Sequence, residues 1–170
     1  VSFFNIGGYI HQVFIPYLND QSTREDVILG YKNLHDCQIS KEYFNKIIGR
    51  IAGRISDSKF FLKGKEYKLY KNSSSDHLHG GYEGFDKKIW KIDNILEEKD
   101  ILKCTMKYFS PHLEENYPGN LECNVTYSLN NQNEFSIYFE GESDQDTIVN
   151  MTNHNYWNFH GHKNYYQNIT

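Results

Sequence analysis

The segment His77-Leu78-His79-Gly80-Gly81 places two histidines directly before two glycines. Histidine both donates and accepts protons near neutral pH, so the pair is a candidate for acid–base chemistry. Residues two apart on an extended chain point to the same side, so we expect His77 and His79 to face one cleft. The glycines permit positive φ angles and a close approach of the main chain. The spacing also leaves open a turn that carries two surface histidines.

A third histidine, His154, lies in the segment Thr-Asn-His-Asn-Tyr-Trp-Asn at positions 152–158. Amide side chains satisfy hydroxyl donors and acceptors together, and flat aromatic rings pack against the apolar face of a sugar. This composition predicts a site that moves a proton on a polyol ring. A buried histidine in a polar turn is the alternative.

Two arginines, Arg50 and Arg54, are separated by small and apolar residues. Arg54 has the side chain that can form two parallel hydrogen bonds to ligand oxygens, which lysine cannot match. We expect Arg50 to be structural and to tie loops together. Arginines in such positions are most often surface or ion-pair residues, so this signal is weak by itself.

Three imidazoles, those of His77, His79 and His154, equal the protein-ligand count of some catalytic zinc sites. No cysteine lies near them in the sequence and no carboxylate spacing completes a zinc motif, so we expect no metal. The chain contains no glycine-rich dinucleotide motif, phosphate loop or nucleophile elbow, and no cofactor is expected.

The chain has 170 residues, a net charge of −4 and three cysteines, Cys37, Cys104 and Cys123. The charge argues against a nucleic-acid partner, and no apolar run approaches the roughly 18 residues of a membrane helix, so no membrane partner is expected. The sparse, odd cysteine count favours a reducing compartment, so we expect a cytoplasmic location. The sequence leaves a monomer and a homodimer both open.

Short runs of alternating polar and apolar residues, with an aromatic content of 16%, predict an all-β, antiparallel fold. Segment 121–129 has an apolar residue at every odd position. We expect turns at 97–100 and 130–133, and one short helix at Lys41–Ile47. The predicted strands are Tyr9–Ile15, Asp26–Gly30, Lys59–Leu62, Tyr67–Tyr70, Lys88–Leu96, Ile101–Tyr108, Leu121–Leu129, Glu134–Glu140 and Thr147–Met151.

Ordered sequence blocks along the whole chain resemble aldose 1-epimerases, the galactose mutarotase family. They are Asn5–Gly8, Val13–Pro16, Asp26–Tyr31, Ile48–Ile55, Phe60, Gly64, Tyr67–Leu69, Asn72, His77–Gly81, Gly84–Phe85, Trp90, Tyr117–Gly119, Val125–Tyr127 and Asn150–His154. The chain departs from the family at Gly53, where many members have asparagine, and at Asn116, Trp157 and Phe159. These differences leave the preferred sugar undetermined.

The resemblance implies a large antiparallel β-sandwich, the galactose mutarotase-like supersandwich, of which residues 1–170 would be a single domain and the N-terminal half. It implies that His154 is the general acid, that His79 contacts the sugar near its ring oxygen and that Arg54 binds the ligand. Asn72 and Tyr156 are implied as further substrate-binding neighbours. The family's general-base glutamate and a ligand-binding aspartate belong to the C-terminal half and have no counterpart in this chain.

The expected function is therefore interconversion of the α and β anomers of a hexopyranose such as glucose or galactose, with a small aldose as the partner. A non-catalytic carbohydrate-binding β-sandwich is the first alternative, because the general base is not in this chain. A hexose-6-phosphate epimerase would need a cationic cluster that is not seen near the histidines. A purely structural half-sandwich with exposed strand edges is the third alternative.

Overall fold

The computed structural model describes residues 1–17 and 20–162, so two parts of the expected domain, 18–19 and 163–170, lie outside the described residues. Its largest element is an antiparallel sheet with the strand order β10-β11-β12-β13. These strands span Lys91–Glu98, Ile101–Ser110, Leu121–Asn130 and Phe135–Ser143. The all-β, antiparallel prediction is thus confirmed.

Alternation along β12 explains why this sheet forms. Leu121, Cys123, Val125 and Tyr127 are buried, whereas Glu122, between the first two, is exposed. This is the period of a strand with one face on the core. Both predicted turns are confirmed, because Glu98 pairs with Ile101 across a two-residue turn and the main-chain N–H of Asn130 donates to Glu134.

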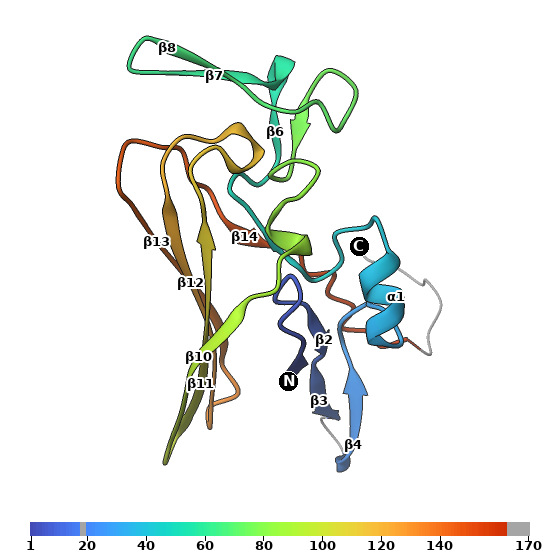
Figure 1. The fold of residues 1–170 in the computed structure, drawn as a ribbon. Coiled ribbons are helices and arrows are strands. Elements are labelled where there is room, and N and C mark those ends of the chain that lie inside the picture. Colours follow the sequence, from blue (N-terminus) through green and yellow to red (C-terminus); the bar gives the residue numbers. More distant parts are fainter. Residues whose placement is uncertain (18–19, 163–170) are drawn as a thin grey trace.

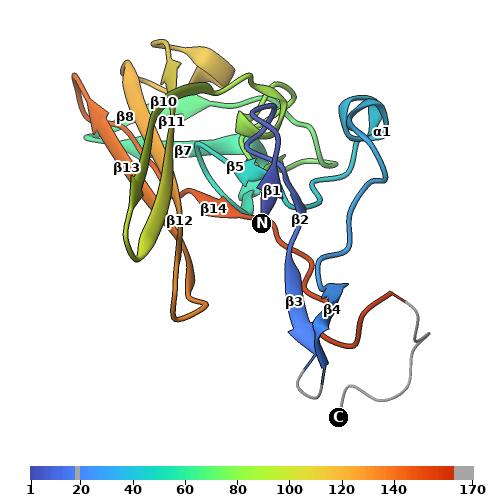
Figure 2. The ribbon, with the colours of Figure 1, turned by 90° about the horizontal axis from the view of Figure 1, so that it is seen from below.

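The other strands are short and pair two by two as β1-β2, β3-β4, β5-β14, β6-β9 and β7-β8. Their bounds are β1 Ser2–Phe3, β2 Ile10–Gln12, β3 Phe14–Tyr17, β4 Asp20–Asp26, β5 Ile47–Ile48, β6 Arg54–Ile55, β7 Lys59–Leu62, β8 Lys65–Lys68, β9 His77–Leu78 and β14 Thr152–Asn153. Figures 1 and 2 both show the four-stranded sheet on one side, β3, β4 and helix α1 (Leu34–Ile39) on the other, and β1, β2, β5 and β14 between them.

The hydrophobic core lies between the inner face of the sheet and these short strands. Trp90, Phe85 and Tyr108 pack with ring centroids 5.4–5.6 Å apart. The core cluster consists of Ile10, Val13, Val27, Ile28, Ile47, Phe85, Trp90, Cys104, Met106, Leu121, Cys123, Val125 and Tyr127. The three cysteines are buried and free. Strands from both ends of the sequence thereby share one core.

The predicted helix at Lys41–Ile47 is wrong. The helix spans Leu34–Ile39 instead, where the Asn33 side chain caps the N-terminus by accepting from the main-chain N–H of Asp36. Within the predicted segment, Asn45 has a φ of 54° and Ile47 begins strand β5. Ile47 is therefore buried by strand pairing rather than on a helix face, and Tyr43 and Phe44 are half-buried outside any strand.

Two strand predictions also need correction. Segment Thr147–Met151 is not a strand, because it forms only an isolated parallel bridge between Asn150 and Ile51, and β14 begins one residue later. Strand β4 ends at Asp26, where the predicted strand Asp26–Gly30 begins. In neither segment does burial alternate: Val27 and Ile28 are both buried, and Val149 and Asn150 are both exposed. Among the described residues, no helix is long and apolar enough to span a membrane.

Candidate active site

The paired strands β6 and β9 position Arg54 and His79. Arg54 pairs with Leu78 in this ladder, and His79 follows at once. The main-chain N–H of His79 donates to the carbonyl oxygen of Gly53 at 3.0 Å, and the Gly53 N–H donates to His79 Nδ1 at 3.0 Å. His79 has a φ of 51°, so the chain turns there. The end of this strand pair thus fixes the main chain of His79 with one hydrogen bond and its ring with another.

A second strand pair, β5 with β14, positions His154. The main chain of His154 donates to the carbonyl of Lys46 and accepts from the N–H of Asn45, both at 2.9 Å. The Asn45 side chain is fully buried, accepts from the N–H of Tyr156 at 3.0 Å and donates to the Leu29 carbonyl at 2.8 Å. Asn45 therefore holds the segment that carries both His154 and Tyr156.

The two strand pairs bring aromatic rings from three separate segments together. The ring centroids of His79 and His154 lie 5.1 Å apart in an edge-on arrangement. Tyr43 lies against both, at 4.7 Å from His79 and 6.1 Å from His154. Tyr156 stacks on His154 at 5.2 Å. Residues far apart in the sequence thus form one cluster, which we call the histidine cluster: Tyr43, His79, His154 and Tyr156.

Burial, together with neighbouring charge, keeps His79 neutral. Burial, followed by the nearby His154 and Arg54, lowers the pKa of His79 to about 4. Burial also raises the pKa of Tyr43. Arg54 is exposed, and within the described part of the chain no hydrogen bond or ion pair engages its guanidinium. A neutral imidazole therefore lies near a guanidinium that has no partner among the described residues.

His77 does not share the face of His79, and the expectation that both point into one cleft is wrong. His77 is fully buried; its Nδ1 contacts the Tyr70 carbonyl at 2.8 Å and its Nε2 contacts the Tyr117 hydroxyl at 2.7 Å. The left-handed backbone at His79 breaks the alternation on which the expectation rested. Burial also excludes the surface-turn alternative for His77.

The structural role expected for Arg50 is confirmed. Its side chain is 2% exposed and makes six hydrogen bonds that join distant loops. The acceptors are Ser110 Oγ, Ser110 O, Pro111 O, Pro118 O, Gly119 O and Thr147 Oγ1. Burial lowers the pKa of Arg50.

Asn72 binds the main chain of Leu78, the residue before His79. Its Oδ1 accepts from the Leu78 N–H at 2.7 Å and its Nδ2 donates to the Leu78 carbonyl at 2.9 Å. This double contact holds β9 and leaves one amide hydrogen and one lone pair for a ligand. Its predicted role in substrate binding stays a prediction.

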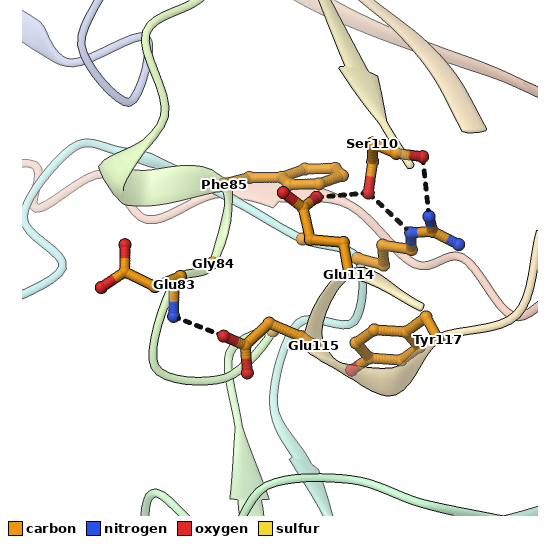
Figure 3. Close-up of a pocket in the computed structure, with 10 residues that line it drawn as sticks. Glu83, Gly84, Phe85, Ser110, Glu114, Glu115 and Tyr117 are labelled. Carbon is orange, nitrogen blue, oxygen red and sulfur yellow. Dashed lines mark hydrogen bonds between the residues drawn. The ribbon is translucent and has the colours of Figure 1, made fainter. Parts of the chain in front are cut away.

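A small hollow beside Gly80 contains glutamates but not the histidine cluster. It leaves essentially no room for a water-sized group, so it is not a small-molecule pocket. Figure 3 shows Glu115 accepting from the main-chain N–H of Glu83 and Glu114 bonded to Ser110. Because these two carboxylates are occupied by structural contacts, we assign neither as a catalytic base.

Comparison with known proteins identifies the family. Residues 1–169 match the family model described as aldose 1-epimerase. The chain belongs to the aldose 1-epimerase family. It is 39% identical to a galactose mutarotase of Sus scrofa over 144 residues, and 34% identical to an aldose 1-epimerase of Escherichia coli over 161 residues.

Solved structures give the same result. A galactose 1-epimerase from Lactobacillus acidophilus superposes with a TM-score of 0.80 at 28% identity and over 90% of this chain. A GalM/aldose epimerase homologue from C. elegans gives 0.82 at 25% identity. This chain spans 40% of the pig protein, 45% of the E. coli protein and 43% of the L. acidophilus chain. The expected length ratio, about half of a family member, agrees with these values.

Sequence reasoning missed Tyr43 and Asn45, which position the two histidines. Both fall in the segment assigned to a helix, so their contacts with residues more than 100 positions away had no local signal. One indication was available for Asn45: asparagine tolerates a positive φ better than most residues. The role of Gly53 was also missed, because it acts through its main chain.

Proposed function

We propose that the protein to which this chain belongs is an aldose 1-epimerase that interconverts the anomers of a hexopyranose. The observation that carries the proposal is the histidine cluster of this family member. Two imidazoles with ring centroids 5.1 Å apart come from segments 75 residues apart along the chain, beside an arginine whose guanidinium has no partner among the described residues.

Anomers interconvert when the hemiacetal ring opens and closes again. A base takes the proton of the C1 hydroxyl while an acid protonates the ring oxygen and the C1–O5 bond breaks. The aldehyde then rotates about C1–C2 and recloses with the proton transfers reversed. Each group works in both directions, so a group that titrates near neutral pH suits the task. We assign the proton on the ring oxygen to His154.

Three neighbours complete this half of the reaction. His79 would hydrogen-bond the sugar oxygen on which charge develops, a preorganised stabilisation that matters most away from water. Arg54 would orient hydroxyl groups through its two parallel donors. Tyr156, which stacks on His154, would cover an apolar face of the sugar. The base is expected outside residues 1–170, as the family resemblance implies.

Mutarotation of freshly dissolved α-glucose or α-galactose, followed by polarimetry, tests the proposal with the complete protein. His154→Ala should lower turnover by about 10²-fold or more, the usual contribution of a general acid. His160→Ala removes an exposed histidine six residues away and is the matched control, with unchanged turnover expected. If His154→Ala keeps full turnover, His154 is not the acid. Sugar binding without any acceleration by the wild type would favour the carbohydrate-binding alternative.

A further inference from the structure

A hydrogen bond from the main chain of Gly53 determines which ring nitrogen of His79 carries the hydrogen. The Gly53 carbonyl accepts from the His79 main chain, and the Gly53 N–H donates to the Nδ1 atom of the ring. A peptide N–H can only donate, so Nδ1 must present a lone pair. A neutral imidazole with a lone pair on Nδ1 carries its hydrogen on Nε2.

The surroundings of the ring agree with this state. The groups that face the imidazole are the Tyr43 ring, the His154 ring and the positive charge of Arg54. Asp86 is buried, which raises its pKa, and its charge contributes to the raised pKa of Tyr43. None of these favours a second proton on His79. Its Nε2 has no hydrogen-bond partner among the described residues.

We propose that the main chain of Gly53 holds His79 as the neutral Nε2–H tautomer, so that His79 is a fixed hydrogen-bond donor to a sugar oxygen and does not itself transfer protons. The part that concerns the sugar rests on the proposed function, whereas the tautomer does not. Gly53 is then a positioning residue for His79, and His154 is the imidazole of this cluster that exchanges protons.

His77 provides an internal reference with the opposite tautomer. The Tyr70 carbonyl can only accept, so Nδ1 of His77 carries the hydrogen and Nε2 accepts from the Tyr117 hydroxyl. Two histidines separated by one residue should therefore differ in which nitrogen is protonated. Any spectrum in which they look alike would contradict the assignment of one of them.

Nitrogen NMR of the complete protein, labelled at its histidines, tests the tautomer directly. The His79 signals, assigned with His79→Gln, should show hydrogen on Nε2 and none on Nδ1 from pH 8 to about pH 5, since its pKa is about 4. His77 should show the reverse pattern. Hydrogen on Nδ1 of His79, or a titration midpoint near 6.5, would overturn the proposal whether or not the protein is active.

A matched pair of substitutions tests the donor role. The amide nitrogen of glutamine lies near the position of Nε2, whereas that of asparagine lies near Nδ1. His79→Gln should therefore keep about tenfold more kcat/KM than His79→Asn, the value of one hydrogen bond of about 1.4 kcal/mol. Equal loss in both variants would reject the donor role. If the wild type has no mutarotase activity, the proposed function fails while the NMR result still decides the tautomer.

A second pair tests Gly53. Its φ is +83° and a Cβ atom there would meet nothing within 4 Å, so only the backbone angle restricts the residue. Asparagine tolerates positive φ and valine does not. Gly53→Asn should keep the Nε2–H signature of His79, and Gly53→Val should lose it while the buried His77 signals remain. An unchanged His79 spectrum in Gly53→Val would contradict the positioning role.

Discussion

Arg50 and Arg54 are close in sequence, as are His77 and His79. Arg50 and His77 are buried in an inner layer of the protein, whereas Arg54 and His79 lie in an outer layer, at the candidate site. Arg50 is 2% exposed with six hydrogen bonds, and Arg54 is exposed with none to a described residue. Both ring nitrogens of His77 are engaged, but in His79 only Nδ1 is.

The difference shows that residue type and spacing do not decide which of two similar side chains is engaged inside the protein and which keeps polar atoms free. Both kinds of residue occur in one strand pair. Arg54 of β6 is exposed and pairs with Leu78, whereas the next pair of the ladder joins Ile55 to the buried His77. The two layers differ in whether their polar side-chain atoms already have hydrogen-bond partners among the described residues. The inner layer makes contacts that stabilise the fold, and the outer layer keeps donors that, in the proposed function, bind the sugar.

The largest expected effect is the difference in stability between the Arg50→Ala and Arg54→Ala variants. Arg50→Ala should lower the free energy of unfolding by at least roughly 4 kcal/mol, or prevent folding, because each buried carbonyl left without a donor costs about 1–3 kcal/mol. Arg54→Ala should change stability by less than about 0.5 kcal/mol but raise KM for the aldose by about 10–100-fold, the value of a charged hydrogen bond. Urea unfolding and mutarotation kinetics measure both. Equal stability losses would abolish the distinction between the layers.

A smaller loss of stability is expected when the Tyr117 hydroxyl, which donates to His77, is removed. Tyr117→Phe leaves the buried Nε2 of His77 without its donor, which should cost about 1–3 kcal/mol of stability and leave kcat unchanged. Tyr70 contacts His77 only through its main-chain carbonyl, so Tyr70→Phe is the matched control. Thermal unfolding compares the two variants. A drop in kcat without a loss of stability in Tyr117→Phe would place His77 in the catalytic layer.

The smallest effect should be a pH dependence shared by both histidines. Burial lowers the pKa of His77, and burial, with His154 and Arg54 nearby, lowers the pKa of His79 to about 4. Below pH 6.5 these histidines bind protons in the unfolded chain but not in the folded chain, so the free energy of unfolding falls from pH 6.5 towards pH 4. His79→Gln should reduce this slope in urea titrations, and His35→Gln, an exposed histidine, should not. A slope unaffected by His79→Gln would show that its pKa is not lowered by folding.

The four-stranded sheet was largely predictable from the sequence. Alternation in segments 101–108 and 121–129 reflects one buried face, and polar turns such as Asn130–Asn133 mark the strand ends. These signals are local, so each strand could be recognised without its partner. Strand β7 was predicted with its observed bounds, Lys59–Leu62.

The site was predictable only where a family resemblance combined separate motifs. His79, Arg54 and His154 each had a common structural alternative, and spacing alone grouped His79 with His77, which the structure buries elsewhere. The roles of Tyr43 and Asn45 could not be predicted from spacing, because these residues contact His154 across more than 100 residues of sequence. The site is built from two-residue strands and positive-φ turns, which leave no periodic pattern in the sequence.

The most direct test of the account is a crystal structure of the complete protein with bound glucose or galactose. We expect the sugar ring beside His79 and His154, with Nε2 of His79 and a ring nitrogen of His154 within about 3 Å of sugar oxygens and Arg54 on a hydroxyl group. A sugar bound elsewhere, with both imidazoles free of it, would contradict the assignment of this cluster as the acid and donor half of an epimerase site.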